Sequence, residues 1–292
     1  MKQLRRTVLF VPANNPRMVE KASKLNSDMV ILDCEDSVPE SEKGRARETL
    51  SNSLSSHSWA GKEVGIRING LDTPHYEEDL KRAVAAGPRF IAIPKVETAD
   101  EVRAVDRTIR RLAGDGYKED SLPKIMVIVE TPRGLIAVEQ ILSSSPLVTA
   151  VEFGSEDFSL SMGIYGFNRS ELATIYARSR VVAAAHAFHV DPLDEAFVDL
   201  RDVEGLRASA ANARSLGFVG KGVIHPSQID VVNQVFSPSK EEIAWARRVL
   251  DAWAEARKEG KGAFRLDEKM VDIVHVKMAE RILGEAEMTG SR

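Results

Sequence analysis

The chain has 292 residues, one cysteine and a formal net charge of −4 at pH 7. This charge excludes a general positive field for nucleic acid or an anionic membrane, and the single cysteine, Cys34, excludes an internal disulfide. No run approaches the 18 or so uninterrupted apolar residues that cross a bilayer, and the N-terminus has no signal-peptide pattern. We therefore expect a cytoplasmic protein without nucleic-acid or membrane partners.

Short apolar runs alternate with segments of helical spacing along residues 1–236. The pattern occurs eight times, which favours a (β/α)8 TIM barrel over an open sheet, and residues 188–190 are its weakest strand. The predicted strands are residues 7–12, 29–33, 64–68, 90–94, 125–130, 148–153, 188–190 and 219–224, and the predicted helices are residues 16–25, 41–54, 76–86, 99–112, 135–142, 171–187, 203–216 and 226–236.

Residues 237–292 follow a helix-only pattern. Pro238 and Ser239 begin a helix that reaches about Arg257, residues 258–262 form a polar linker, and residues 269–283 form an amphipathic helix. Such an extension is too small to make its own core. We expect it to pack on the barrel or on a neighbouring subunit.

Two predicted strands end in carboxylates. Five apolar residues lead into Glu130, and the next strand, at 148–153, is followed closely by Asp157. Because neighbouring parallel strands end at the same edge, these side chains converge, and they repel unless a cation lies between them. Hard oxygen ligands suit Mg²⁺, so the sequence predicts a magnesium site in the barrel mouth.

Further charged residues follow the other strands. Glu35 and Asp36 follow the second strand, Arg67 lies in the third, and Lys95 follows the fourth. Carboxylates interleaved with cations indicate a metal with an anionic substrate, although the ordinary polarity of strand ends is the alternative.

Several common sites are missing. The sequence has no phosphate-binding glycine loop of the nucleotide type, no paired cysteine or H-E-x-x-H zinc motif, and no serine-hydrolase elbow. His186 and His189 are three residues apart, but we expect the first at a helix end and the second in a strand, rather than a shared metal. Trp245 and Trp253 lie eight apart on one helical stripe and indicate packing.

Taken together, these features resemble the citrate lyase β-subunit family, within the magnesium-dependent C–C lyases that include malyl-CoA and citramalyl-CoA lyases. The resemblance extends over nearly the whole chain in the family's order. The matching stretches are residues 4–12, 31–38, 67–74, 94–98, 130–134, 154–157 and 269–272.

The resemblance implies a barrel whose C-terminal segment reaches a neighbouring subunit, usually in a homotrimer. It implies that Glu130 and Asp157 are Mg²⁺ ligands, that Arg67 holds a substrate oxygen, and that Asp272 is the acid or base contributed by the adjacent subunit. Glu130 would also contact the substrate through the metal site.

Looser matches concern the surroundings of the metal and the coenzyme. Glu35 and Asp36 resemble the carboxylates that surround metal-bound water, and Arg6 and Lys21 lie where related lyases contact coenzyme A phosphates. The chain departs from the family at Cys34, at His225 and at residues 267–268, and the last two bear on the identity of the substrate.

The activity that the resemblance implies is Mg²⁺-dependent cleavage of a citryl-like thioester, carried by coenzyme A or an acyl-carrier protein, with citrate lyase α and γ subunits as possible partners. Residues 71–74 and 155–157 favour this branch. The alternatives are a stand-alone malyl-CoA or citramalyl-CoA lyase, a thioesterase of the same family, and a non-catalytic barrel scaffold.

Overall fold

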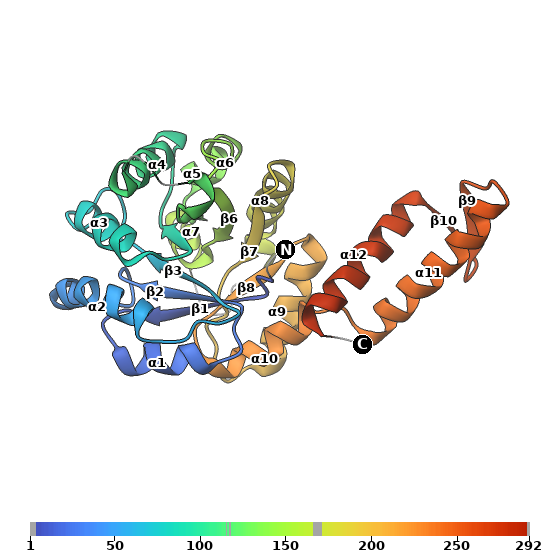
Figure 1. The fold of residues 1–292 in the computed structure, drawn as a ribbon, viewed down its shortest axis with the longest axis horizontal. Coiled ribbons are helices and arrows are strands. Elements are labelled where there is room, and N and C mark those ends of the chain that lie inside the picture. Colours follow the sequence, from blue (N-terminus) through green and yellow to red (C-terminus); the bar gives the residue numbers. More distant parts are fainter. Residues whose placement is uncertain (1–3, 115, 117, 166–170, 291–292) are drawn as a thin grey trace. The chain divides into compact units, whose positions relative to one another are not determined.

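Eight parallel strands form a closed barrel in chain order, with helices between successive strands (Figure 1). The structure, a computed structural model, describes residues 4–114, 116, 118–165 and 171–290. The predicted (β/α)8 barrel is therefore confirmed. Its strands are β1 (Thr7–Pro12), β2 (Met29–Asp33), β3 (Glu63–Arg67), β4 (Phe90–Ile93), β5 (Lys124–Val129), β6 (Val148–Phe153), β7 (Asp191–Asp194) and β8 (Gly220–Val223).

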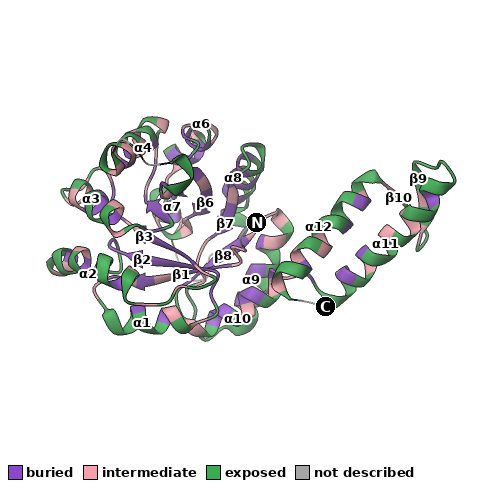
Figure 2. Cartoon of the chain, in the orientation of Figure 1, coloured by how far each residue is buried: buried purple, intermediate pink, exposed green. Residues whose placement is uncertain are grey.

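The helices around the barrel carry one buried and one exposed face, whereas the strands are almost entirely buried (Figure 2). Within the described residues, no helix is long and apolar enough to cross a membrane. The helices are α1 (Pro16–Lys24), α2 (Lys43–Ser55), α3 (Tyr76–Ala86), α4 (Ala99–Ala113), α5 (Pro132–Ile136), α6 (Val138–Leu142), α7 (Ser155–Ser161), α8 (Ile175–Ala187), α9 (Val203–Leu216) and α10 (Pro226–Val235), with 3-10 turns η1 (Glu40–Glu42), η2 (Glu119–Ser121) and η3 (Glu171–Ala173).

Alternate residues of the strands build the barrel core. Met29 and Ile31 of β2, Met126 of β5 and Ala150 of β6 belong to one buried apolar cluster. Because side chains in a strand alternate between two faces, the next positions in these series point to the same interior. At the C-terminal ends of the strands these series reach Asp33, Glu130 and Glu152, which places the functional candidates there.

The seventh strand was predicted wrongly. It is β7, not residues 188–190, because α8 continues to Ala187 and His189 adopts a positive φ of 57° that ends any extended run. The strand could not be recognised from its sequence, because Pro192 cannot donate a ladder hydrogen bond and two of its four residues, Asp191 and Asp194, are aspartates. The predicted helix at 135–142 is instead the pair α5 and α6.

Residues from Gln234 onward belong to a second compact unit, separate from Arg5–Asn233. This unit contains α11 (Lys240–Lys258), an antiparallel hairpin of β9 (Ala263–Leu266) and β10 (Lys269–Asp272), and α12 (Ile273–Thr289). The prediction of a helix over 269–283 was wrong for its first turn, which is strand β10.

The expectation that the extension lacks a core of its own was also wrong. Ala246 and Val249 of α11 pack with Val271, Val276 and Ala279 around the hairpin and α12. The two tryptophans that were expected to pack, Trp245 and Trp253, are partly buried against this cluster.

A buried ion network lies on the barrel wall. Asp194 of β7 accepts hydrogen bonds from Arg178 of α8 at 2.9 and 3.0 Å and from Lys221 of β8 at 2.6 Å, and all three side chains are fully buried. The carboxylate of Asp194 therefore contacts two buried cations and links α8 to β7 and β8.

Asp194→Asn keeps the shape of the side chain and removes this charge. We expect it to lower the free energy of unfolding by about 3–5 kcal/mol, since two buried cations lose the carboxylate that both contact. Urea unfolding measures the loss. Asp100→Asn, which breaks an exposed pair with Arg103, is the matched control and should have little effect; equal losses in the two variants would contradict the role of the network.

Candidate functional site

Arg67 and Asp33 form a fixed pair inside the barrel mouth. Arg67 donates Nε to Asp33 Oδ1 and Nη2 to Asp33 Oδ2, both at 2.7 Å, and its guanidinium lies 5.0 Å from the ring centre of Phe10. Its Nη1 lies 3.0 Å from Glu35 Oε2. The two-point contact fixes the plane of the guanidinium and leaves Nη1 as the edge nearest Glu35.

Asp33 is a functional candidate that the sequence reasoning missed as an individual residue. It is fully buried and also accepts hydrogen bonds from the backbone of Glu35 and from Ser37. Burial opposes its ionisation, but the charge and hydrogen bonds of Arg67, together with Ser37, lower the pKa of the Asp33 carboxyl below its ordinary value. The sequence did contain evidence that Asp33 faces the barrel interior, because it is the next alternate residue of β2 after Met29 and Ile31.

Lys95 connects several predicted site residues. It has a positive φ of 52°, and its backbone N–H donates to Glu130 Oε1 at 2.7 Å. Its ammonium donates to Glu35 Oε1 at 2.7 Å and lies 3.6 Å from Asp36 Oδ1 and 3.8 Å from Asp157 Oδ2. The structure thus gathers the four predicted carboxylates around one lysine.

Glu130 follows β5 and is buried. A Cβ at Gly154 would lie 2.5 Å from Glu130 Oε2, so the end of β6 makes room for this carboxylate by having no side chain there. Burial, reinforced by the charges of Glu35 and Asp157, raises the pKa of Glu130 to about 8. Glu130 and Asp157 therefore share one electrostatic environment, as the sequence predicted.

Glu152 of β6 lies deeper in the same interior series. Its Oε2 is buried without a hydrogen-bond partner, and its Oε1 occupies space that a Cβ at Gly222 would fill. Burial raises the pKa of Glu152 to about 8, against the charge of Arg67 and with that of Glu130. The sequence placed Glu152 at a strand end, but it did not indicate that this carboxyl is buried or that its Oε2 has no hydrogen-bond partner.

These residues fit a divalent cation. Across the described ranges, no three His, Cys, Asp or Glu side chains are already gathered as a metal cage. Mg²⁺ commonly takes one or two protein carboxylates and completes its shell with water and substrate, which matches the pair Glu130 and Asp157. Burial raises the pKa of Glu130 and the charges of Glu35 and Asp157 raise it further, and these negative charges are what such an ion would neutralise.

The remaining predicted residues lie elsewhere. Arg6 precedes β1, at the opposite end of the barrel, and its guanidinium pairs with Asp28 at 2.8 Å, so the structure does not bring it to the mouth. Lys21 is exposed on α1. Cys34 is buried, and burial raises the pKa of its thiol, in keeping with a packing role.

Asp272 belongs to the second unit, where it caps α12. It accepts hydrogen bonds from Val274 N at 3.0 Å and from His275 Nδ1 at 2.8 Å. The bond from His275 lowers the pKa of Asp272, so that this half-buried group is a carboxylate at neutral pH.

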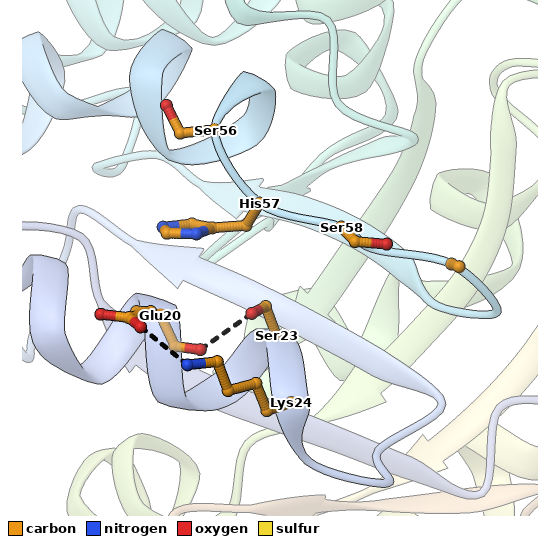
Figure 3. Close-up of a pocket in the computed structure, with 7 residues that line it drawn as sticks. Glu20, Ser23, Lys24, Ser56, His57 and Ser58 are labelled. Atoms are coloured by element: carbon orange, nitrogen blue, oxygen red, sulfur yellow. Dashed lines mark hydrogen bonds and ion pairs between the residues drawn. The ribbon is translucent and has the colours of Figure 1, made fainter.

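A surface pocket elsewhere on the barrel is a different feature (Figure 3). It lies between the end of α1 and the segment that leads into β3, so it is at the end of the barrel where strands begin. Its polar side chains bind one another, as in the contact of Lys24 with Glu20 at 2.7 Å. The lining residues are Glu20, Ser23, Lys24, Ser56, His57, Ser58 and Ala60.

Comparison with known proteins identifies similar chains. The model of the HpcH/HpaI aldolase/citrate lyase family matches residues 6–226. Citrate lyase subunit beta of Leuconostoc mesenteroides subsp. cremoris is 35% identical over 97% of this chain and 93% of its own, and the mitochondrial citramalyl-CoA lyase of Mus musculus is 36% identical over 96% and 85%. The crystal structure of the protein CitE from Mycobacterium tuberculosis with magnesium, acetoacetate and coenzyme A has a TM-score of 0.78 and 33% identity, covering 97% of this chain and 98% of that one.

The buried carboxyls make the stability of the metal-free protein depend on pH. The pKa of Glu130 is about 8 in the fold and near 4.5 when unfolded, so between these values the folded state holds a proton that the unfolded state has lost. The free energy of unfolding therefore falls as pH rises from about 4.5 to 8, by about 1.4 kcal/mol per pH unit for each such group. Urea unfolding in EDTA should show this slope, and Glu130→Gln should reduce it.

The control is Glu48→Gln, an exposed glutamate on α2, which should leave the slope as it is. Glu152→Gln should reduce the slope in the same way as Glu130→Gln, because burial raises both pKa values to about 8. An unchanged slope in both Glu130→Gln and Glu152→Gln would show that these groups are not held protonated.

Proposed function

The chain belongs to the HpcH/HpaI aldolase/citrate lyase family, and from this premise we propose that it is a Mg²⁺-dependent lyase that cleaves a carbon–carbon bond in the thioester of a 3-hydroxy acid. The observation that carries the proposal is Glu130, buried beside Asp157 in a mouth that also contains a fixed arginine. A non-catalytic scaffold would not need a buried carboxyl with further carboxylates close to it, an arrangement that costs folding free energy.

The relatives favour this chemistry. The Leuconostoc protein is a citrate lyase subunit, the mouse protein is a citramalyl-CoA lyase, and the Mycobacterium protein was solved with magnesium and coenzyme A. The matches cover 85–98% of the length of these three relatives, so the similarity is not confined to one segment of them. We propose a coenzyme A thioester as the substrate class and Mg²⁺ as the cofactor.

Glu130 and Asp157 would hold the ion. When bound, Mg²⁺ supplies positive charge that favours electron density on the oxygens of the departing oxo acid. Arg67 would bind a carboxylate or carbonyl oxygen of the substrate through Nη1, because Asp33 occupies Nε and Nη2. Glu35, which now faces Nη1 and Lys95, would orient water or substrate beside the ion.

Asp272 would exchange a proton with the carbon of the acetyl-thioester enolate. As a carboxylate with a lowered pKa it can accept that proton in the direction of bond formation and return it on cleavage. We propose that it is contributed by a neighbouring subunit of a homo-oligomer, as in the trimer expected from the family. We propose a cytoplasmic location because a chain with one cysteine, Cys34, does not depend on disulfides and so suits a reducing compartment.

Citryl, malyl and citramalyl thioesters remain the candidate substrates. The citrate lyase branch would add α and γ subunits and an acyl-carrier protein as partners, whereas the coenzyme A branch would act alone. A thioesterase of the same family would share the metal site but release free coenzyme A with the hydroxy acid intact. Lys21 is the remaining candidate for a contact with coenzyme phosphates.

Purified protein with citramalyl-CoA, malyl-CoA or citryl-CoA tests the proposal. We expect Mg²⁺-dependent release of an oxo acid together with acetyl-CoA, measured by chromatography. Asp157→Asn should lower kcat/KM by about 10²–10³, the cost of removing one electrostatic group from such a site. Asp100→Asn, which alters an exposed aspartate of α4, is the matched control and should keep full activity.

Release of free coenzyme A with the hydroxy acid intact would establish the thioesterase instead. Turnover of a free coenzyme A thioester without other subunits would reject dependence on a citrate lyase complex. Absence of both Mg²⁺ binding and turnover would favour the scaffold.

Asp272→Asn tests the proton exchange. Asparagine still caps α12, so the helix should keep its stability, but it cannot take a proton. We expect kcat to fall by about 10²–10⁴ and the exchange of acetyl-CoA methyl protons with deuterium oxide to stop. Mixed oligomers of Arg67→Ala and Asp272→Asn chains should regain activity if the two residues come from different subunits. Full activity of Asp272→Asn would refute the assignment.

A further inference from the structure

Lys95 contacts both predicted metal ligands, by different parts of the residue. Its backbone N–H donates to Glu130 at 2.7 Å, and its ammonium lies 3.8 Å from Asp157. The left-handed backbone at this position, φ 52°, lies in a region that few residues other than glycine adopt, and such conformations cluster where a site needs a particular geometry. The lysine is held there by contacts from three separate strand ends.

The ammonium of Lys95 provides positive charge where the mouth lacks it. Burial opposes this charge, but the hydrogen bond to Glu35 and the charges of Asp36 and Asp157 outweigh burial and raise the pKa of Lys95. The side chains of Lys95 and Asp157 are 37% and 34% exposed, so an ion from solvent can reach the space between them. The lysine is thus a monovalent counter-charge at the place where the proposed function requires a divalent one.

A divalent ion and the ammonium cannot both keep these positions without repulsion. Mg²⁺ bound to Asp157 would lie about 2 Å from its oxygen, and so within a few ångströms of an ammonium that is itself 3.8 Å from that carboxylate. The ammonium has a second anchor at Glu35, at 2.7 Å, and a flexible four-carbon stem. It can therefore withdraw from Asp157 without losing its closest hydrogen bond.

We infer that Lys95 is a positioning residue of the metal site, whose ammonium holds the carboxylates together in the metal-free protein and withdraws toward Glu35 and Asp36 when Mg²⁺ enters. This inference rests on the proposed function for the identity of the ion. Lys95 then has two opposite effects. It stabilises the metal-free mouth, and it weakens Mg²⁺ binding by competing for the carboxylate of Asp157.

Lys95→Met separates these effects. It keeps the backbone N–H that binds Glu130 and removes only the ammonium. We expect Mg²⁺ to bind the free protein at least ~10-fold more tightly, since a unit charge a few ångströms from the ion and partly exposed is removed. Isothermal titration with MgCl₂, without substrate, measures this, and the metal-free melting temperature should fall while the rise in melting temperature on adding Mg²⁺ becomes larger.

Three variants control the experiment. Lys95→Gln repeats the loss of charge if the Met variant does not fold. Lys95→Arg keeps a cation and should bind Mg²⁺ no more tightly than the wild type does. Lys24→Met removes one exposed positive charge at the other end of the barrel and should leave the dissociation constant unchanged, which separates a local effect from net charge.

The outcomes are distinguishable from those for the proposed function. Tighter Mg²⁺ binding by Lys95→Met or Lys95→Gln, together with a lower metal-free melting temperature, supports the inference. A lower melting temperature with unchanged or weaker Mg²⁺ binding shows an ordinary structural ion pair and overturns the inference alone. Absence of Mg²⁺ binding by the wild type and by both uncharged variants overturns the inference and the proposed function together.

Discussion

The mouth of this barrel contains more negative charge than its own cations can neutralise. Among the residues described in the mouth, the carboxylates are Asp33, Glu35, Asp36, Glu130, Glu152 and Asp157, and the cations they contact or face most closely are Arg67 and Lys95. Arg67 is largely engaged by Asp33, which leaves the charge of the others to Lys95. Burial raises the pKa values of Glu130 and Glu152, and the neighbouring carboxylates raise them further. A fold that maintains such an arrangement has a use for an added cation.

The closed parallel barrel is what makes this concentration of charge possible. Every strand runs in the same direction, so residues more than a hundred positions apart in the chain meet at one rim. Beneath the rim, the same alternate positions carry Met29, Ile31, Met126 and Ala150, whose burial fixes the strands. The stability of the barrel and the chemistry of its mouth therefore use successive positions of the same interior series, apolar below and charged above.

The sequence was sufficient for the barrel and for the expectation that Glu130 and Asp157 lie close together, because buried parallel strands have long β-branched runs with abrupt polar ends. It failed at β7, where proline and aspartates replace the apolar run, and at the hairpin of β9 and β10, where alternation is too short to separate from a helix. The partner of Arg67 and the backbone of Lys95 could not be read from the sequence either, since each depends on contacts across different strands. These pairs form only when the closed barrel brings the ends of different strands together.

Arg67 and Lys95, two cations of the same mouth, differ in how firmly their side chains are held. The guanidinium of Arg67 is fixed by a two-point contact with a fully buried carboxylate and by the face of Phe10, so its direction is set before any ligand arrives. The ammonium of Lys95 has one close contact, two longer ones and a flexible stem, so it can move without breaking the barrel. A fixed cation suits recognition of a substrate oxygen, whose position must not vary during bond cleavage. A movable cation suits the exchange of charge with an ion that enters and leaves, and this difference follows from the number of contacts each side chain makes.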